Sequence, residues 1–329
     1  MDNAVKISLS GLSLKKIEQF VESVEEPKFR AKQLHQWIYQ KSASDFDAMT
    51  SLSKTFRQKL NNVAVITTSK IKQKLISSDG TIKYLLEYPD GNVVETVLMR
   101  FDNRTNLTAC VSSQIGCPVG CVFCATGKKG FTRNLLAHEI TNVVFMGQGE
   151  PLLNLDNVIK AIEIINESLV IGMRRITVST SGIVPQIYKL AEEKFPLTLA
   201  LSLHAPTHEL RKTLIPIEEK YPVNEILKAV NHYNQTTSRR LTIEYTVIAD
   251  VNDSKEDAKA LAKLIKDLHC YVNFISYNPA CSDKFKKPTV EKLNMFKHIL
   301  ELSGKKVTVR LERGADIAAA CGQLSGQIV

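Results

Sequence analysis

The sequence feature that most constrains the fold is the alternation of strand-like and helix-like segments after residue 107. Short runs of β-branched and other apolar residues indicate buried strands, and segments with helical periodicity separate most of them. The predicted strands are 107–112, 142–146, 175–180, 197–203, 241–248, 271–277 and 306–310, and the predicted helices are 157–168, 184–194, 222–235, 254–268 and 290–303. Such alternation predicts an α/β fold in which helices cover a parallel sheet, and this number of units suits a partial (β/α)6 barrel.

The chain before residue 103 follows two other patterns. Residues 1–66 have apolar side chains at helical spacing and many lysines and arginines, which predicts a basic helical accessory domain. Residues 67–102 contain alternating and β-branched segments, with Asp79-Gly80 and Asp90-Gly91 as turn signals, which predicts a small antiparallel β segment. We therefore expect three parts, namely 1–66, 67–102 and a core of 103–329.

Three cysteines lie on a loop rich in Gly and Pro, directly after the first predicted strand of the core. Cys117, Cys121 and Cys124 are spaced so that their thiolates can all point toward one soft metal centre. A mononuclear zinc site would normally have a fourth Cys or His close by, and none follows within the next several residues. Three thiolates suit a four-iron cluster with one iron left open, where a substrate or cofactor can bind. The spacing therefore indicates chemistry more than a structural metal site.

Polar segments follow several of the predicted strands. They are Gly147–Pro151, Ser179–Gly182, Ser202–His204 and Asn278-Pro279. Each alone has ordinary loop composition, and Gly147-Gln-Gly149 is not a dinucleotide fingerprint because the third glycine is missing. Since the carboxyl ends of parallel strands meet at one edge, we expect all of these segments beside the cysteine loop, where an α/β barrel binds its ligands.

Composition limits the partner and the location. The formal net charge of +9 hints at a polyanionic partner, and the basic N-terminal block is either a solvated helical face or a surface that contacts nucleic acid. The N-terminus lacks the apolar run of a signal peptide, and no stretch has the length of a membrane span. Seven cysteines are too few for a secreted disulfide scaffold of this length, so we expect a cytoplasmic protein.

Two residues outside these motifs allow both a structural and a functional interpretation. Glu95 is flanked by valines and leucine in a predicted strand, so its carboxylate either faces solvent or projects into a site. Cys321 follows three alanines, and a lone cysteine in such a segment is ordinarily a small buried apolar residue. The residues alone leave both alternatives open.

The spacing Cys117-x3-Cys121-x2-Cys124, followed by the strand end Gly149-Glu150-Pro151, resembles the radical S-adenosylmethionine superfamily. More narrowly, the chain resembles the RlmN/Cfr family of 23S ribosomal RNA adenosine methyltransferases from about residue 10 to about residue 325. The shared segments are 112–114, 121–127, 133–135, 145–154, 179–185, 202–205, 277–279 and 319–324. Segments 11–14 and 29–34, Glu150-Pro151 and Arg313-Gly314 favour the RlmN branch over the Cfr branch.

This resemblance implies a radical-SAM barrel that methylates adenine C2 in the peptidyl transferase centre of 23S rRNA and in tRNA next to the anticodon. C2 is an electron-poor carbon that cannot displace the methyl of a sulfonium, so the family uses a radical route with a [4Fe-4S] cluster and two S-adenosylmethionine molecules per turnover. We further expect an electron donor such as flavodoxin or ferredoxin, no membrane and a monomer. The alternatives are Cfr-like methylation at C8 and, in another class, a non-catalytic metal-binding module that binds RNA.

The resemblance also implies roles for individual residues. Cys117, Cys121 and Cys124 would hold the cluster, and S-adenosylmethionine would contact Gly149, Glu150, Ser179, Ser202, Leu203, His204 and Asn278. Cys321 would carry the transferred methyl group, and Cys110 would attack the sulfur of Cys321 to release the product and leave a disulfide. Glu95 would take the C2 proton, and its apolar neighbours are expected to raise its pKa. Cys270 and Cys281 match nothing in the family pattern.

The chain departs from the family pattern at one place. Only about 22 residues separate Cys124 from the Gly147–Glu150 loop, roughly 20 fewer than the family has, and a parallel crossover needs about a dozen. Residues 137–140 look like the start of the first barrel helix, and residues 141–145 already look like the next strand. Either this helix is truncated or residues are missing, and we predict a break between Ile140 and Asn142.

Overall fold

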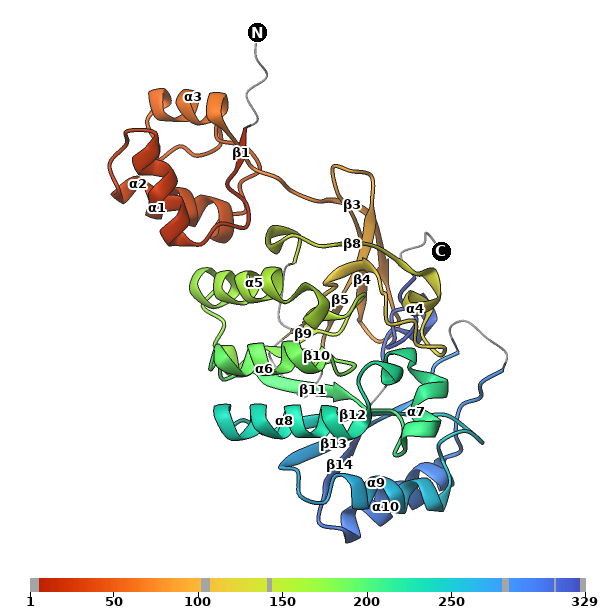
Figure 1. Ribbon diagram of the computed structural model, residues 1–329. Coiled ribbons are helices and arrows are strands. Elements are labelled where there is room, and N and C mark those ends of the chain that lie inside the picture. The colour runs from red at the N-terminus through yellow and green to blue at the C-terminus, as the bar shows by residue number, and fades with distance from the viewer. Residues whose placement is uncertain (1–5, 102–106, 141–143, 280–283, 311, 326–329) are drawn as a thin grey trace.

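A ten-stranded sheet forms the centre of the molecule (Figure 1). The computed structural model describes residues 6–101, 107–140, 144–279, 284–310 and 312–325. The strand order in the described part is β14-β13-β12-β11-β10-β9-β6-β5-β4-β3, and all neighbours from β6 to β14 are parallel. These parallel strands are β6 (Thr108–Cys110), β9 (Val144–Phe145), β10 (Thr177–Thr180), β11 (Thr198–Ser202), β12 (Leu241–Val247), β13 (Cys270–Ser276) and β14 (Lys306–Val309). The predicted α/β fold with a parallel sheet is confirmed.

Amphipathic helices cover one face of the parallel strands, as the sequence pattern predicts. They are α5 (Leu155–Ser168), α6 (Val184–Glu192), α8 (Val223–Thr237), α9 (Lys255–Leu264) and α10 (Val290–Leu302). Their apolar sides pack against Val, Ile and Leu of the strands in one continuous core. A further short helix, α7 (His208–Leu214), lies at the carboxyl ends of the strands and was not predicted from the sequence. The helices therefore close one face of the parallel part of the sheet.

The antiparallel strands predicted for residues 67–102 are present, and they extend the central sheet. They are β3 (Lys70–Ile76), β4 (Ile82–Glu87) and β5 (Val93–Met99), paired as an antiparallel meander. Strand β5 also pairs antiparallel with β6, with Val97 opposite Cys110. This pairing places the face of β5 that carries Val97 beside the first strand of the parallel sheet. Strand β5, which the sequence suggested to be part of a separate segment, therefore lies directly beside Cys110.

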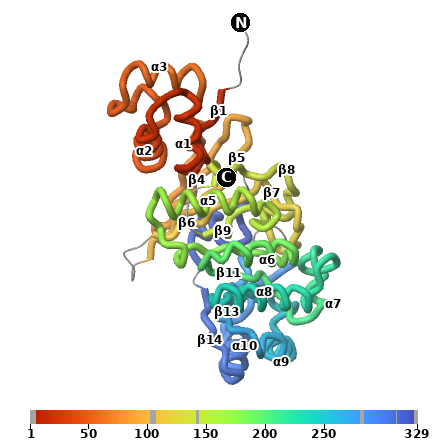
Figure 2. Tube along the Cα trace, turned by 60° about the vertical axis from the view of Figure 1, so that its left-hand side comes forward, coloured from red at the N-terminus to blue at the C-terminus, as the bar shows by residue number. Residues whose placement is uncertain are grey.

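The N-terminal helices form a small body with a hydrophobic core of their own. They are α1 (Leu14–Ser23), α2 (Phe29–His35) with a π-helical turn at Gln36–Gln40, and α3 (Lys54–Val63); strands β1 (Ile7–Ser8) and β2 (Ala64–Val65) pair beside them. Figures 1 and 2 both show this body beyond one end of the sheet. It contacts the core at the end of α5, where His35 Nε2 and Ser168 Oγ are 2.9 Å apart and Gln40 Nε2 donates to Ser168 O.

The connection from β6 to β9 differs from the other crossovers. In its described part it consists of the cysteine loop, α4 (Ala125–Lys129), a hairpin of β7 (Gln114–Gly116) and β8 (Phe131–Asn134), and a single 3-10 turn at Ala137–Glu139. Residues 137–140, which resemble the beginning of a long helix, therefore form one turn only. The predicted break between Ile140 and Asn142 falls on 141–143, which lie outside the described residues. No helix in the described ranges is both long enough and apolar enough to cross a membrane.

Candidate active site

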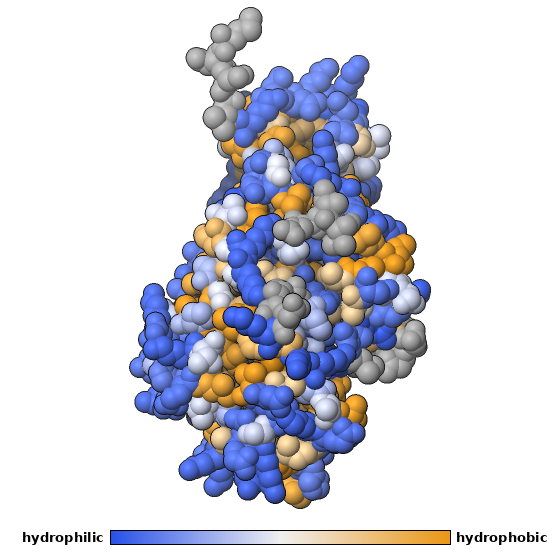
Figure 3. Space-filling model, turned by 90° about the vertical axis from the view of Figure 1, so that its right-hand side faces the viewer, coloured by the Kyte–Doolittle hydropathy of each residue, from blue (hydrophilic) through white to orange (hydrophobic). Residues whose placement is uncertain are grey.

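Two adjoining cavities lie at the carboxyl ends of the parallel strands. Cys117, Cys121 and Cys124 line the first cavity together with every predicted cofactor contact except Leu203. The second cavity shares Cys124 and Cys321 with the first and adds Cys110. Figure 3 views the molecule from the side toward which β11 points in Figure 1, and hydrophobic residues gather near the middle of this face among hydrophilic ones. The structure therefore brings the cysteine loop, the strand ends and the C-terminal cysteine together.

Glycines in the loop after β9 allow it to lie directly against the cysteine loop. A Cβ atom on Gly147 would lie 2.6 Å from the carbonyl of Val111, and one on Gly149 would lie 2.6 Å from Cβ of Gln114. Gly149 also has a φ of +100°, which favours glycine. The close approach is needed for the Glu150 backbone N–H to donate to Gln114 Oε1 at 2.8 Å. This contact fixes the strand end beside the three cysteines.

The carboxylate of Glu150 joins two neighbouring strand ends. Its Oε2 accepts hydrogen bonds from the backbone N–H and the hydroxyl of Ser181, at 2.7 and 2.8 Å, and its Oε1 accepts from Leu152 N–H. Burial raises the pKa of Glu150, while these hydrogen bonds oppose that shift. The side chain thus joins the end of β9 to the end of β10.

His204 is held as a neutral imidazole between the cysteine loop and β12. Its Nδ1 accepts from Thr246 N–H at 2.9 Å, which leaves the proton on Nε2, and its ring packs edge to face with Phe123. Burial lowers the pKa of His204 to about 3, and nearby Arg211 acts in the same direction. Leu203 differs from its neighbours because its side chain lies in the hydrophobic core, so only its backbone is available to a cofactor.

The C-terminal segment that carries Cys321 is attached to the cysteine loop. Ala125 N–H donates to Gly322 O at 2.7 Å, and the Thr126 hydroxyl donates to Leu324 O at 2.6 Å. From the opposite side, Asn278 Nδ2 donates to Cys321 O. About 200 residues separate the two segments in sequence, yet these three contacts hold Cys321 against the loop that carries Cys117, Cys121 and Cys124.

Cys110 lies on β6 beside the same C-terminal segment. It is buried in a small apolar cluster with Val97, Met99, Ala319 and Leu324. Burial raises the pKa of Cys110 to about 12, the proximity of Cys321 adds to the shift, and Arg310 opposes it. Cys110 is therefore a neutral thiol at physiological pH, close to a second thiol and to one guanidinium group.

This environment predicts slow alkylation of Cys110. Because the thiolate is the nucleophile, the rate of reaction with iodoacetamide should rise about tenfold per pH unit between pH 7 and pH 10 without reaching a plateau. Cys321, which is more exposed, should be labelled first. Peptide mass spectrometry after timed labelling of the anaerobic protein measures both rates. A plateau for Cys110 near pH 8 would contradict the buried, neutral thiol.

Glu95 is buried and ion-paired. Only 1% of its side chain is exposed, and its Oε1 lies 2.9 Å from Nζ of Lys83 on the neighbouring strand β4. Lys83 also donates to Ala318 O at 3.1 Å, in the segment that leads to Cys321. Since side chains alternate along a strand, Glu95 shares a face of β5 with Val97 and Met99, which line the second cavity. Of the two alternatives for Glu95, a carboxylate facing solvent is wrong.

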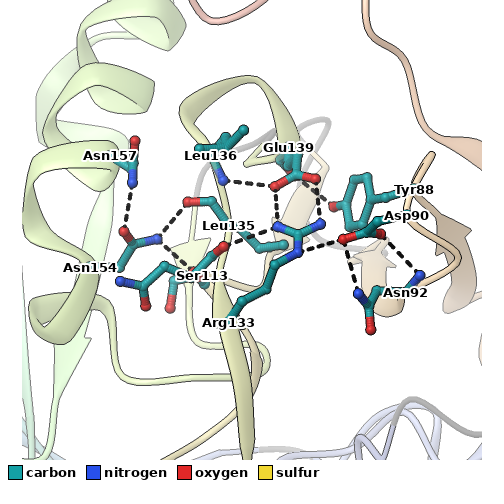
Figure 4. A network of polar contacts seen from close by, with 11 residues as sticks. Tyr88, Asp90, Asn92, Ser113, Arg133, Leu135, Leu136, Glu139, Asn154 and Asn157 are labelled. Atoms are coloured by element: carbon teal, nitrogen blue, oxygen red, sulfur yellow. Dashed lines mark hydrogen bonds and ion pairs between the residues drawn. The ribbon is translucent and has the colours of Figure 1, made fainter.

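A polar network anchors the flank of the cysteine loop (Figure 4). Arg133 on β8 makes a bidentate ion pair with Glu139, at 2.7 and 2.8 Å, and its Nε donates to Asp90 in the turn before β5. The amide of Asn154 donates to the carbonyls of Ser113 and Leu135, at 2.8 and 2.7 Å. The network joins the turn before β5, the hairpin beside the cysteines and the segment after Glu150, so it holds together elements that surround both cavities.

Comparison with known proteins identifies the family. A model described as the ribosomal RNA large subunit methyltransferase N-terminal domain matches residues 7–66, and the radical SAM superfamily model matches residues 111–265. The probable dual-specificity RNA methyltransferase RlmN of Alkaliphilus oremlandii is 46% identical over 337 residues, which cover 97% of each chain. The chain belongs to the RlmN family of radical SAM methyltransferases.

Two further comparisons agree with this assignment. The dual-specificity RNA methyltransferase RlmN of Marinobacter nauticus is 43% identical over 99% of this chain and 94% of the relative. The crystal structure of a radical SAM methyltransferase from Sphaerobacter thermophilus superposes with a TM-score of 0.93 and 43% identity, covering 98% of this chain and all of the other. The alignment with the Alkaliphilus relative is longer than the 329 residues of this chain, so that relative has residues without a counterpart here.

Membership of this superfamily implies S-adenosylmethionine and a [4Fe-4S] cluster, and the site fits both. Three free thiols from one loop line the first cavity. The described residues contain no group of three or more Cys, His, Asp and Glu placed to hold a single metal ion. A cluster does not need such a group because each thiolate binds its own iron. Within the described part of the chain, two buried oxygens of the cavity, Glu244 Oε2 and Asn278 Oδ1, have no hydrogen-bond partner, as expected where a polar cofactor binds.

The structure also reveals site residues that the sequence did not single out. Glu244 lies inside β12 and Arg310 directly follows β14, and both line the first cavity. Each is a charged residue in or beside an apolar strand, which is a usable sequence signal because strand interiors rarely hold unpaired charge. Lys83 carries the same signal in β4. Arg211 on α7 is fully buried beneath the strand ends, and no sequence pattern marked it.

Proposed function

We propose that this enzyme methylates C2 of adenine in 23S rRNA and in tRNA next to the anticodon. The observation that carries the proposal is the placement of Cys110 and Cys321, two free thiols outside the metal-binding motif, in one cavity beside Cys124. A simple methyl transfer from S-adenosylmethionine to a nucleophile needs no thiol. Two additional thiols suit a route in which the protein itself carries the carbon and afterwards releases it.

Cys117, Cys121 and Cys124 would hold the cluster, and the strand ends would hold S-adenosylmethionine. When bound, the cluster and cofactor supply the one-electron chemistry that an unreactive aromatic carbon requires. The role of the protein is to orient the cofactor against the cluster and to exclude water. Neutral His204 and the glycine backbone at 147–149 provide uncharged contacts for this purpose.

The two thiols divide the transfer between them. Cys321 takes a methyl group from one S-adenosylmethionine and loses its thiol proton. Before the methyl carbon is bonded to C2, this carbon would lose one hydrogen atom to a second S-adenosylmethionine, and C2 would lose its proton to Glu95 and one electron to the cluster. Cys110, as a thiolate, then attacks the sulfur of Cys321. The S–C bond breaks, its electron pair passes to the carbon, which takes up a proton, and a disulfide between Cys110 and Cys321 remains. The high pKa of Cys110 keeps this thiol unreactive until a base removes its proton.

Glu95 is our proposed acceptor of the C2 proton. Its carboxylate is buried, and the contact with Lys83 Nζ at 2.9 Å holds it in one position. Lys83 also contacts the segment that carries Cys321, so the ion pair links the base to the methyl carrier. Glu95 can take the C2 proton only from an adenine that is unstacked from its RNA. The basic N-terminal helices are our proposed contact surface for that RNA.

Nucleoside analysis tests this proposal. Total RNA from cells lacking the gene, with and without the enzyme supplied from a plasmid, is digested and analysed by mass spectrometry. We expect 2-methyladenosine in both 23S rRNA and tRNA only when the enzyme is present. Appearance of 8-methyladenosine would instead support the Cfr-like alternative. Protein that contains one zinc and no iron or sulfide after anaerobic purification, and that leaves RNA unmodified, would support a binding module.

A further inference from the structure

Glu244 is a buried carboxylate inside the cofactor cavity for which the proposed chemistry has no role. It lies in β12 directly beside Ser202 of β11 and beside Asn273 of β13. Only 4% of the residue is exposed, and it lines the same cavity as the three cluster cysteines. A charged group in such a place is costly unless a hydrogen-bond donor meets it.

The described neighbouring side chains donate a hydrogen bond to only one of the two oxygens of this carboxylate. Asn273 Nδ2 donates to Glu244 Oε1 at 3.0 Å. The Asn273 amide is itself oriented, because the hydroxyl of Thr308 donates to its carbonyl oxygen and so directs its NH2 group toward Glu244. Glu244 Oε2 has no hydrogen-bond partner among the residues that the structure describes. The side chains of Thr308, Asn273 and Glu244 are thus linked by hydrogen bonds across three neighbouring strands. The second carboxylate oxygen of Glu244 remains available to a ligand in the cavity.

We propose that Glu244 Oε2 accepts a hydrogen bond from the ribose hydroxyls of S-adenosylmethionine. This inference rests on the proposed binding of that cofactor in the first cavity. The cofactor offers four kinds of partner for a carboxylate, namely the sulfonium, the ammonium, the adenine amino group and the ribose hydroxyls.

Charge argues against the two cationic groups. The guanidinium of Arg310 lines the same cavity and is near enough to Glu244 that each affects the pKa of the other. A sulfonium placed beside Glu244 would therefore also face Arg310, and it has no hydrogen to donate. The ammonium of the methionine moiety would face the same guanidinium if it were placed beside Glu244. Neutral donors remain, and among them the vicinal hydroxyls offer two.

The position of Ser202 supports the ribose. Ser202 is the last residue of β11, its Cα pairs with that of Glu244, and both residues line the cavity. A hydroxyl and a carboxylate that lie side by side on adjacent parallel strands can each bond one of two adjacent ribose hydroxyls. The carboxylate then fixes the rotation of the sugar, and hence the direction of its C5′ carbon relative to the cluster.

Ligand binding to the anaerobic, cluster-containing enzyme tests the inference. Dissociation constants are measured by equilibrium dialysis for S-adenosylmethionine, S-adenosylhomocysteine and the 2′-deoxy and 3′-deoxy forms of S-adenosylhomocysteine. For Glu244→Gln we expect binding of both natural ligands to weaken by a similar factor, roughly 10- to 100-fold, because a hydrogen bond to a charged group is lost. At least one deoxy analogue should bind to the wild type and the variant almost equally.

Glu301→Gln, on the exposed part of α10, is the matched control and should bind all ligands as the wild type does. Iron and sulfide content, together with the melting temperature, verifies that Glu244→Gln is folded and holds its cluster. Unchanged binding by Glu244→Gln overturns the inference, as does weakening confined to S-adenosylmethionine, which would point to the sulfonium. Equal weakening for natural and deoxy ligands also overturns it, because it would place the contact elsewhere. Failure of the wild type to bind S-adenosylmethionine would instead contradict the proposed function.

Discussion

Cys321→Ala is expected to abolish methylation of the RNA, whereas Cys110→Ala is expected to accumulate protein that is covalently attached to RNA. Without the sulfur at position 321, the proposed carrier of the methyl carbon is absent, so activity should fall below detection. Without the thiol at position 110, the carbon can still be bonded to adenine, but nothing cleaves its bond to sulfur. Both cysteines line the second cavity, so each substitution acts at the same place and on a different step.

The two outcomes are separated by one measurement. Variants are incubated anaerobically with labelled RNA, S-adenosylmethionine and reductant, and the products are resolved on a denaturing gel. A band of RNA-linked protein should appear for Cys110→Ala, and it should vanish in the double variant with Cys321→Ala. Cys270→Ala is the control, because this buried cysteine on β13 packs in the main hydrophobic core and should behave as the wild type. A Cys110→Ala enzyme that methylates RNA normally, without an adduct, would remove Cys110 from the mechanism.

The parallel part of the fold could be predicted because its signals are local. Strands such as β11 and β12 are mostly apolar and buried along nearly their whole length, and amphipathic helices separate them. The same signals failed at residues 137–140, where a helical start is followed by a single turn. Helical propensity needs sufficient length to be realised, and the short connection does not provide it.

The site could be predicted only in part, for a related reason. The cysteine loop and the strand ends are motifs whose position in a parallel sheet follows from topology. By contrast, the contact between the Cys321 segment and the loop depends on hydrogen bonds such as Ala125 to Gly322, between residues far apart in sequence. The ion pair of Glu95 with Lys83 depends on strand register, which the sequence leaves open. The roles of Cys110 and Cys321 were therefore expected from the family resemblance and not from the residue pattern.

The scaffold beneath the strand ends depends on a second buried ion pair. Arg211 and Glu218 are both fully buried, and Nη1 of Arg211 contacts Oε2 of Glu218. Arg211 also donates to the backbone carbonyls of Leu203 and Ser202, at 3.0 and 3.2 Å, at the end of β11. Glu218 in turn accepts from Val223 N–H at 2.7 Å. The pair therefore connects the end of β11, which lines the first cavity, to the start of α8.

Arg211→Met is expected to destabilise the protein strongly. The substitution leaves the carboxylate of Glu218 buried without its cation, which costs about 3–5 kcal/mol, and it leaves several strand-end carbonyls without a donor. For a chain of this size, the melting temperature should fall on the order of 10 °C. Differential scanning calorimetry of the anaerobic, cluster-containing enzyme measures this loss.

A double-mutant cycle separates the ion pair from the loss of packing. Glu218→Gln alone should also destabilise the enzyme, and the Arg211→Met/Glu218→Gln double variant should lose much less than the sum of the two single losses, since no uncompensated charge remains. Lys212 and Glu219 provide the matched cycle because they are the next residues along the same two segments and form an exposed ion pair. Their coupling should be close to experimental error, as is usual for solvated pairs. Equal coupling in the two cycles would mean that burial of the Arg211 pair contributes nothing to holding the strand ends.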